Sequence, residues 1–241
     1  FRRVLFRSFP AGSTSATSGT TVAGGNGSGS GANQFANPSA IFVTASGVVY
    51  VADPGNRRVQ RFPAGSTSAT NGTTVAGGNG SGDAANQVAW PSAVFVDASG
   101  NVYVSDEDNN RVQRWIPGAT AGVAVAGGNG AGAAANQVSA PRGVWVDAIG
   151  RVFVADSGNA RVQRWSAGAA TGVTVAGGNG AGTGRNQIGD GDGVRLRSDG
   201  SLLVVDAANS RVQRWLQAPN RPTTPTDRKS TRLNSSHITI S

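Results

Sequence analysis

The stretch Asn159-Ala160-Arg161-Val162-Gln163-Arg164-Trp165 occurs, with small changes, four times in the chain. The other copies begin at Asn56, Asn109 and Asn209, so consecutive copies start 53, 50 and 50 residues apart. Each copy follows a short apolar run that ends in aspartate, as Val152-Phe153-Val154-Ala155-Asp156 does. A repeat of this length indicates a protein built from stacked supersecondary units.

Four short β-strands are expected in each repeat, and no stretch shows the 3.6-residue period of a helix. The first strand, rich in β-branched residues, is expected at 20–24, 73–77, 123–127 and 173–177. After a Gly- and Asn-rich loop, the second is expected at 40–43, 93–96, 143–146 and 193–196. The runs that end in Asp give the third, at 49–53, 102–106, 152–156 and 202–206. The Arg-Val-Gln-Arg-aromatic run gives the fourth, at 58–62, 111–115, 161–165 and 211–215.

The third strand is apolar on both faces, because Val102, Tyr103 and Val104 follow one another without a polar residue. A strand covered on one face would alternate, so this one is expected to be buried on both. Four-stranded sheets that pack face to face around an axis meet that condition, which predicts an all-β fold, a β-propeller. Trp115 is expected to cover a neighbouring blade and to keep its indole N–H near the rim.

Each repeat has the same pattern of residues. Pro-x-x-Val-x-Val-Asp-x-x-Gly is followed by Val-Tyr-Val-Ala and then by Asp-x-x-Asn-x-Arg-Val-Gln-Arg. This pattern resembles the NHL repeat, and the resemblance covers all four copies, from about Thr20 to Leu216. The resemblance implies a propeller, usually of six blades, of which about four are present, with repeat cores at 38–78, 91–128, 141–178 and 191–216. The fourth copy departs from the pattern at Gly191, Arg195 and Arg197.

The two ends of the chain resemble translated sequencing adapter, at 1–8 and 227–241. We therefore expect a propeller domain at 9–217, a linker at 218–226 and an open-ended fragment of a longer protein. Without the adapter-like ends, the net charge of +8 falls to +3, with 15 basic and 12 acidic residues. This small net positive charge does not indicate nucleic-acid binding. The absence of Cys excludes disulfides and cysteine metal sites.

Three residue types recur once in every blade and are interpreted as a structural motif. Asp and Asn form local hydrogen bonds in turns, and Arg can pair with a carboxylate through two N–H groups. We expect each set to fix the turn between the third and fourth strands of its own blade. The sets are Asp53, Asn56 and Arg58; Asp106, Asn109 and Arg111; Asp156, Asn159 and Arg161; and Asp206, Asn209 and Arg211.

The function predicted from the sequence is that of a non-enzymatic binding or scaffold module, with a protein as the partner. Loops held by a rigid frame carry function in such folds, so residues that vary between blades are the candidates. The candidate binding residues are Arg57, Trp90, Glu107, Asp108, Asn110, Ser157, Ala160 and Ser210.

Two alternatives stay open: an RNA-binding propeller, and part of a propeller lyase or hydrolase whose catalytic residues lie in missing blades. The segment between the adapter-like ends has no His and no Cys, so the usual general base and metal ligands are missing from it. We expect no catalytic residue, no metal, no cofactor and no membrane segment in this chain. Three acceptor patterns, at Asn26, Asn71 and Asn79, favour a secreted or cell-surface protein.

Overall fold

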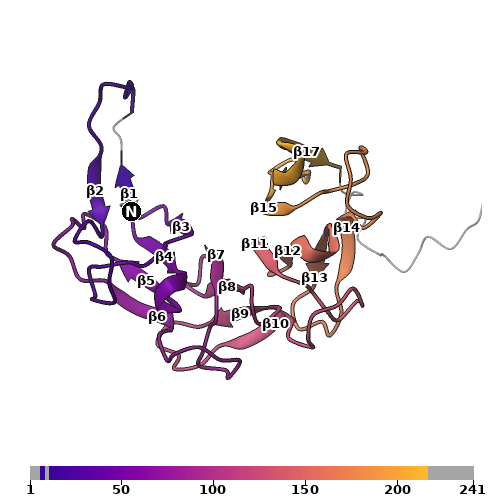
Figure 1. Cartoon of the computed structure of the whole chain (residues 1–241), viewed down its shortest axis with the longest axis horizontal. Helices are drawn as coiled ribbons and strands as arrows, with labels where there is room; N and C mark the ends of the chain where they lie inside the picture. The colour runs from indigo at the N-terminus through magenta and orange to yellow at the C-terminus, as the bar shows by residue number, and fades with distance from the viewer. Residues whose placement is uncertain (1–5, 9–10, 217–241) are drawn as a thin grey trace, which may run out of the picture.

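The computed structural model describes residues 6–8 and 11–216 of the 241-residue chain. Within them, the chain forms four antiparallel sheets side by side in an arc, which are the blades of a β-propeller (Figure 1). Blades 1, 2 and 3 each have four strands, and blade 4 has three. Each blade runs from the inside of the arc outward in sequence order. The second, third and fourth strands expected in each repeat are therefore the first, second and third strands of a blade, and the strand expected before them is the outer strand of the preceding blade.

The strands take equivalent places in the blades. The innermost strands are β3 (Ala40–Val43), β7 (Pro91–Val96), β11 (Pro141–Val146) and β15 (Gly191–Leu196). The second strands are β4 (Val49–Asp53), β8 (Val102–Asp106), β12 (Val152–Asp156) and β16 (Leu202–Asp206). The third strands are β5 (Arg58–Phe62), β9 (Arg111–Trp115), β13 (Arg161–Trp165) and β17 (Arg211–Trp215). The outer strands are β6 (Thr73–Gly77), β10 (Val123–Gly127) and β14 (Val173–Gly177).

Short elements complete the chain. One-turn 3-10 helices η1 (Pro54–Asn56), η2 (Ser157–Asn159) and η3 (Ala207–Asn209) join the second strand of a blade to the third. Before blade 1, β1 (Phe6–Ser8) pairs with β2 (Thr20–Ala23). β1 falls within the adapter-like residues; its pairing does not test their origin, which stays a prediction.

The core lies between neighbouring blades rather than inside any one of them. One cluster joins Tyr50 and Val59 of blade 1 to Val94 and Val104 of blade 2. Equivalent clusters join blade 2 to blade 3 and blade 3 to blade 4. The second strands of blades 1 to 3 are buried along their whole length, as the continuous apolar runs predict.

Two tryptophans of the third strands, Trp115 and Trp165, are more deeply buried than expected. Trp115 packs in the cluster between blades 1 and 2, as expected, but only 2% of it is exposed. Its indole N–H is therefore not at a solvated rim, and the expectation was wrong. In blade 3, Trp165 donates its Nε1–H to Oε1 of Gln163, 3.1 Å away. In blade 3 a side chain of the same strand thus satisfies the indole N–H, whereas the buried N–H of Trp115 has no hydrogen-bond partner among the described residues.

Aromatic side chains form a line across the inner strands. The ring of Phe42 lies 5.1 Å from that of Phe95, which lies 4.9 Å from Trp145, both edge to face. In blade 4 the guanidinium of Arg195 lies 5.3 Å from the centre of the Trp145 ring. Arg195 thus continues the line by a cation–π contact, which explains how the fourth repeat tolerates it.

Candidate binding face

The carboxylate of Asp156 is at the centre of the motif in blade 3, where it is inaccessible to solvent. Arg161 donates from Nε to Asp156 Oδ2 at 2.6 Å, and Asn159 donates from Nδ2 to both oxygens at 2.9 Å. The backbone N–H of Ser139 donates to Oδ1 at 2.7 Å. These donors satisfy the hydrogen-bonding capacity of the buried carboxylate on both of its oxygens.

The rest of the Arg161 guanidinium binds the loop that enters the blade. Its Nη1 donates to the carbonyl of Ala133 at 2.8 Å, and its Nη2 donates to those of Ala134 and Gln137 at 3.2 and 3.1 Å. Asp156 and Arg161 therefore clamp the connection from blade 2 onto blade 3. The same Asp–Arg pairs occur in the other blades, at Asp53–Arg58, Asp106–Arg111 and Asp206–Arg211.

The pair in blade 4 is more open than the others. The Arg211 side chain is 28% exposed, against 10% for Arg161, because no outer strand covers β17 among the described residues. Burial raises the pKa of Asp206, but hydrogen bonds from Asn209, Arg211 and the Gly189 N–H outweigh it, so the pKa is lowered overall. The repeated Asp, Asn and Arg side chains thus form hydrogen bonds within their own blades and with the loops that enter them. That they serve the fold rather than a ligand stays a prediction.

Two candidate binding residues do not reach the surface. Ser157 is 7% and Ala160 is 5% exposed. The hydroxyl of Ser157 donates to the carbonyl of Gly191 in blade 4, so it belongs to an interface between blades. We therefore remove Ser157 and Ala160 from the binding residues, because they are buried. Residues at this turn vary between blades to suit the packing of each blade as well as to face solvent.

The other candidates lie on the face that carries the turns between the second and third strands of each blade, which we call the loop face. Arg57, Asp108 and Ser210 are exposed, and Glu107 and Asn110 are half-buried. The Asn110 side chain accepts a hydrogen bond from the Ala140 N–H, so it supports the loop before blade 3.

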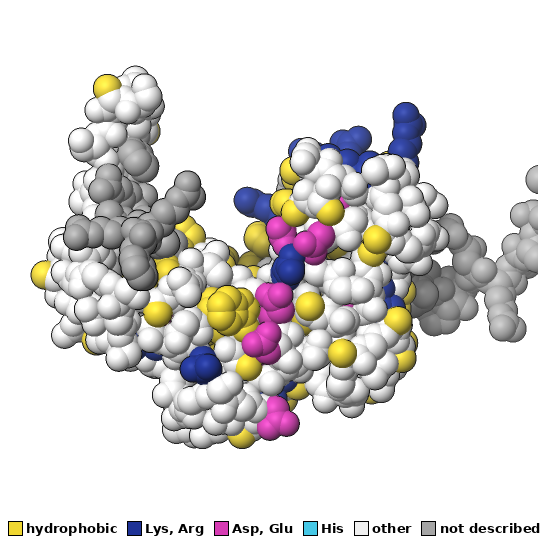
Figure 2. Space-filling model, in the orientation of Figure 1, with side chains coloured by type: hydrophobic (Ala, Val, Ile, Leu, Met, Phe, Trp, Pro, Cys, Tyr) yellow, Lys and Arg dark blue, Asp and Glu magenta, His cyan; other side chains and the backbone are white. Residues whose placement is uncertain are grey.

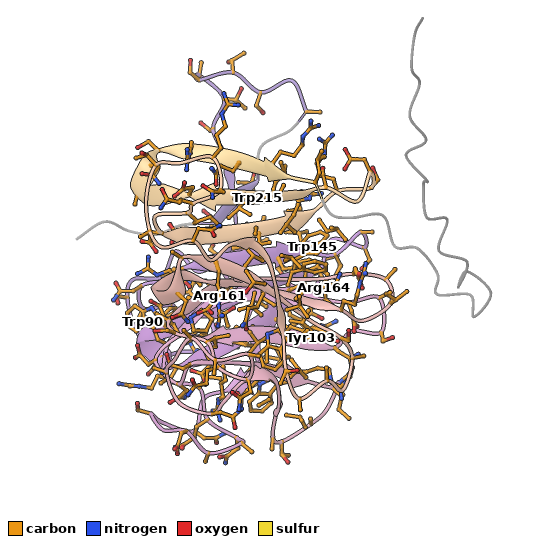
Figure 3. The ribbon with its side chains drawn as sticks, turned by 90° about the vertical axis from the view of Figure 1, so that its right-hand side faces the viewer. Trp90, Tyr103, Trp145, Arg161, Arg164 and Trp215 are labelled. Carbon is orange, nitrogen blue, oxygen red and sulfur yellow. The ribbon has the colours of Figure 1, made fainter. Side chains whose placement is uncertain are left out.

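Trp90 is 39% exposed, and Figure 3 shows it at the edge of the molecule, apart from Trp145 and Tyr103. Its carbonyl accepts from the Glu107 N–H at 2.9 Å, which places the two residues side by side.

A charged cluster that the sequence analysis missed spans three blades on this face. Arg142 of blade 3 pairs with Glu107 of blade 2 at 3.2 Å, and with Asp190 and Asp192 on the blade 4 side at 2.6 and 3.2 Å. Figure 2 shows acidic and basic side chains in a row across the face turned to the viewer. Burial lowers the pKa of Arg142, but its bonds to Glu107 and Asp192 outweigh this, so the pKa is raised.

The signal for this cluster was present in the repeat. Arg142 and Asp192 occupy the same place in successive repeats, one residue into the innermost strand. In the earlier repeats that place is taken by Ser39 and Ser92, whose hydroxyls donate to the carbonyls of Pro91 and Pro141 in the next blade. Aligning the repeats would have shown that this position reaches from blade to blade.

The acceptor asparagines differ in their contacts. The side-chain amides of Asn26 and Asn79 donate to the carbonyls of Asn33 and Asn86, and so hold their own loops. Asn71 is exposed. Glycosylation at Asn71 would therefore disturb the loops least, and its occurrence stays a prediction.

Among residues 6–8 and 11–216, no group of three or more His, Cys, Asp or Glu side chains is placed to hold a metal ion. Nor does any described helix have the length and apolarity needed to span a membrane.

The arc of antiparallel blades defines the chain as a β-propeller protein. Residues 89–115, which cover the first three strands of blade 2, match the NHL repeat. The recognition of this repeat from the sequence is confirmed. No curated protein matches the chain.

Solved structures share the fold at low identity. A protein of unknown function from Bacteroides thetaiotaomicron matches with a TM-score of 0.59 at 16% identity, over 74% of this chain and 47% of that one. A chain of a nidogen/laminin complex matches with a TM-score of 0.53 at 17% identity, over 73% and 59%. A putative gluconolactonase matches with a TM-score of 0.50 at 16% identity, over 76% and 64%. The chain thus spans between about half and two thirds of these proteins, and at such identities the likeness carries the fold alone.

Proposed function

We propose that the chain is a non-enzymatic binding module, which presents the loop face of a propeller arc to a protein partner. The proposal rests on a difference between two sets of residues, those repeated in every blade and those that vary between blades. The motif repeated in every blade is engaged by backbone carbonyls, as Arg161 is. The side chains that remain exposed on the same face differ from blade to blade, and Trp90 and Asp108 are two of them.

The centre of the proposed surface is Trp90 with the neighbouring Glu107. A partly exposed Trp beside charged groups is a common anchor in protein interfaces. Glu107, Asp190 and Asp192 outnumber the one cation, Arg142, that they share. We therefore propose a partner segment with an apolar side chain for Trp90 and a basic side chain for these carboxylates.

The RNA-binding alternative is less well supported. The repeated Arg side chains are tied to carboxylates and carbonyls, and the charged cluster on the loop face is acidic overall, which repels phosphate. The enzyme alternative is represented by a solved structure described as a putative gluconolactonase, but at 16% identity it carries the fold alone. The proposal assigns no catalytic residue to this chain. A total of six blades, expected from the resemblance, also remains a proposal.

The test is selection of peptides from a displayed random library on the parent chain. Peptides that the parent retains should be lost on the double variant Trp90→Ala/Glu107→Ala. They should be kept by the control Ile149→Ala, whose side chain is 68% exposed in the turn at the opposite ends of the strands. The melting temperature of the double variant should stay close to that of the parent, because the Glu107–Arg142 pair is partly exposed. Peptides retained equally by the parent and the double variant would overturn the proposal.

A further inference from the structure

The two ends of the arc carry the two halves of an interface that the molecule builds three times. On blade 4, Val212 is 63% exposed, whereas its equivalents Val59, Val112 and Val162 are fully buried against the next blade. On blade 1, Ile41 is 49% and Val43 is 52% exposed. Their equivalents in blade 2, Val94 and Val96, are 6% and 4% exposed against the preceding blade.

Blade 4 also lacks a strand among the described residues. In blade 3 the outer strand β14 pairs with β13, with Val162 opposite Ala176 and Arg164 opposite Val173. β17 repeats the β13 sequence from Arg211 to Trp215, but its outer edge has no partner strand. An unpaired edge of this kind presents N–H and C=O groups that can template another strand.

The sequence that fits this edge is already in the chain, at its other end. Thr20-Thr21-Val22-Ala23-Gly24 is identical to Thr73-Thr74-Val75-Ala76-Gly77. That second stretch pairs in blade 1 with Arg58-Val59-Gln60-Arg61, which β17 repeats. β17 and β2 therefore carry the two sequences of a strand pair that blade 1 forms.

β2 lies at the right place to receive β17. Ala23 is fully buried in a cluster with Phe35, Val49 and Phe62 on the open side of blade 1. The place that β17 would take is held by β1, which makes three residue pairs with β2, whereas β5 makes four with β6. Figure 1 shows β2 and β17 at opposite ends of the arc with an open gap between them, so β2 of the same molecule is not beside β17.

We propose that the edge of β17 binds β2 of a second copy of this chain, where it displaces β1 and pairs in the register of β5 with β6. Val212 then lies opposite Ala23 of the second copy, and Arg214 opposite Thr20. Blade 4 of one copy is thereby seated on blade 1 of the other, so one joint covers Val212 and also Ile41 and Val43. The joint is head-to-tail, and it closes into a ring or extends as a chain of copies.

We propose this joint for the 241-residue chain. In a longer chain, the further blades expected from the resemblance would cover the same faces of blades 1 and 4 within one molecule. The proposal is independent of the binding function above, because Trp90 and Glu107 take no part in the joint.

Disulfide trapping tests the register directly, because the chain has no cysteine of its own. Arg214→Cys and Thr20→Cys are prepared as two full-length variants, one with a mass tag, then mixed and oxidised. Residues directly opposite each other on antiparallel strands are close enough for a disulfide. We expect the mixed disulfide between the two variants to predominate over links between like chains. Links between like chains alone, or no links, would overturn the proposal.

Sedimentation of the undisturbed chain tests the joint without cysteine. The parent should form dimers or larger species as its concentration rises, and Val212→Lys should remain monomeric with an unchanged melting temperature. Val212 is already exposed within one copy, so the Lys should not affect folding of the monomer. The control Ile149→Lys, at an exposed turn outside the joint, should assemble as the parent does. A parent that stays monomeric, or a Val212→Lys variant that assembles normally, would contradict the joint.

Discussion

Arg57, Asn110, Ala160 and Ser210 occupy one place in four blades and share a left-handed backbone, with φ between 50° and 54°. Each immediately precedes the third strand of its blade. This backbone brings the Cβ of an ordinary residue too close to the following carbonyl, and only Gly avoids that contact. The chain nevertheless has no Gly at this place, so the turn is strained in blades 1, 3 and 4. Asn110 in blade 2 adopts this backbone more readily than other non-Gly residues do.

Arg57 is the best position to measure this strain, because its side chain is exposed. We predict that Arg57→Gly has a free energy of unfolding about 0.5–1 kcal/mol above that of Arg57→Ala, since relief of strain exceeds the extra chain entropy of Gly. Urea unfolding of the two variants makes the comparison. An Ala variant as stable as the Gly variant would show that the turn is unstrained.

Tyr103 should titrate late. Burial raises the pKa of the Tyr103 hydroxyl above the ordinary 10.0. The Asp97 carboxylate, which accepts a hydrogen bond from this hydroxyl at 3.2 Å, raises the pKa further. The folded protein therefore keeps this proton at a pH where the unfolded chain loses it. The stability that Tyr103 contributes is full below about pH 10 and is lost as the pH rises through the folded value.

Ultraviolet titration of Tyr50→Phe isolates this group, since the chain has two tyrosines. We expect a phenolate midpoint above 10 in the folded protein. The same titration of Tyr103→Phe provides the control for the remaining tyrosine. A midpoint of 10 or less for Tyr103 would contradict the described contact with Asp97.

The outer strands end in glycines that allow a close approach of two backbones. Gly127, with φ of 66°, ends β10, and a Cβ there would lie 2.5 Å from the carbonyl oxygen of Asn110. Gly130 has a similar φ of 76°, but a Cβ there would meet nothing within 4 Å. The two positions thus separate backbone strain from steric overlap.

We predict that Gly130→Ala lowers the free energy of unfolding by about 1–2 kcal/mol, from strain alone. Gly127→Ala should lower it by about 1–3 kcal/mol more, because the chain must also move away from the new methyl group. Chemical denaturation of both variants measures the difference. Equal losses would show that the end of β10 is not closely packed against the turn before β9.

The strands were predictable from the sequence, because each is a short apolar or β-branched run closed by a turn. The start of the innermost strands was less so. β7 begins at Pro91 rather than at residue 93, because a bulge between Pro91 and Ala93 lets pairing continue past the apolar run. The one-turn helices before β5, β13 and β17 were not predicted, since three residues carry no helical period.

The candidate site was less predictable than the fold. The candidate residues were chosen by variation between repeats, which does not separate exposed Asp108 from buried Ala160. Arg142 was not among the candidate residues. Its role became visible only when the blades brought it between Glu107 and Asp190, which are far apart in sequence.

As a whole, the arc is held together by its interfaces between blades and by the loops that cross them. Hydrophobic clusters join each blade to the next, and the Asp–Arg pair of each blade fixes the loop that enters it. We infer that this pair serves the fold, which leaves the variable residues of the loop face for a partner.

Urea unfolding of Arg161→Ala measures what this pair contributes to the stability of the fold. Asp156 is fully buried and Arg161 is 10% exposed, so removal of the Arg leaves a buried charge without its partner. We predict a loss of about 3–5 kcal/mol in the free energy of unfolding. Arg185→Ala, at an exposed loop position, should stay within about 0.5 kcal/mol of the parent. If Arg161→Ala instead unfolds like the parent, and RNA binding loses affinity with a salt slope lower by about one unit, the repeated arginines form a phosphate-binding face and the account is contradicted.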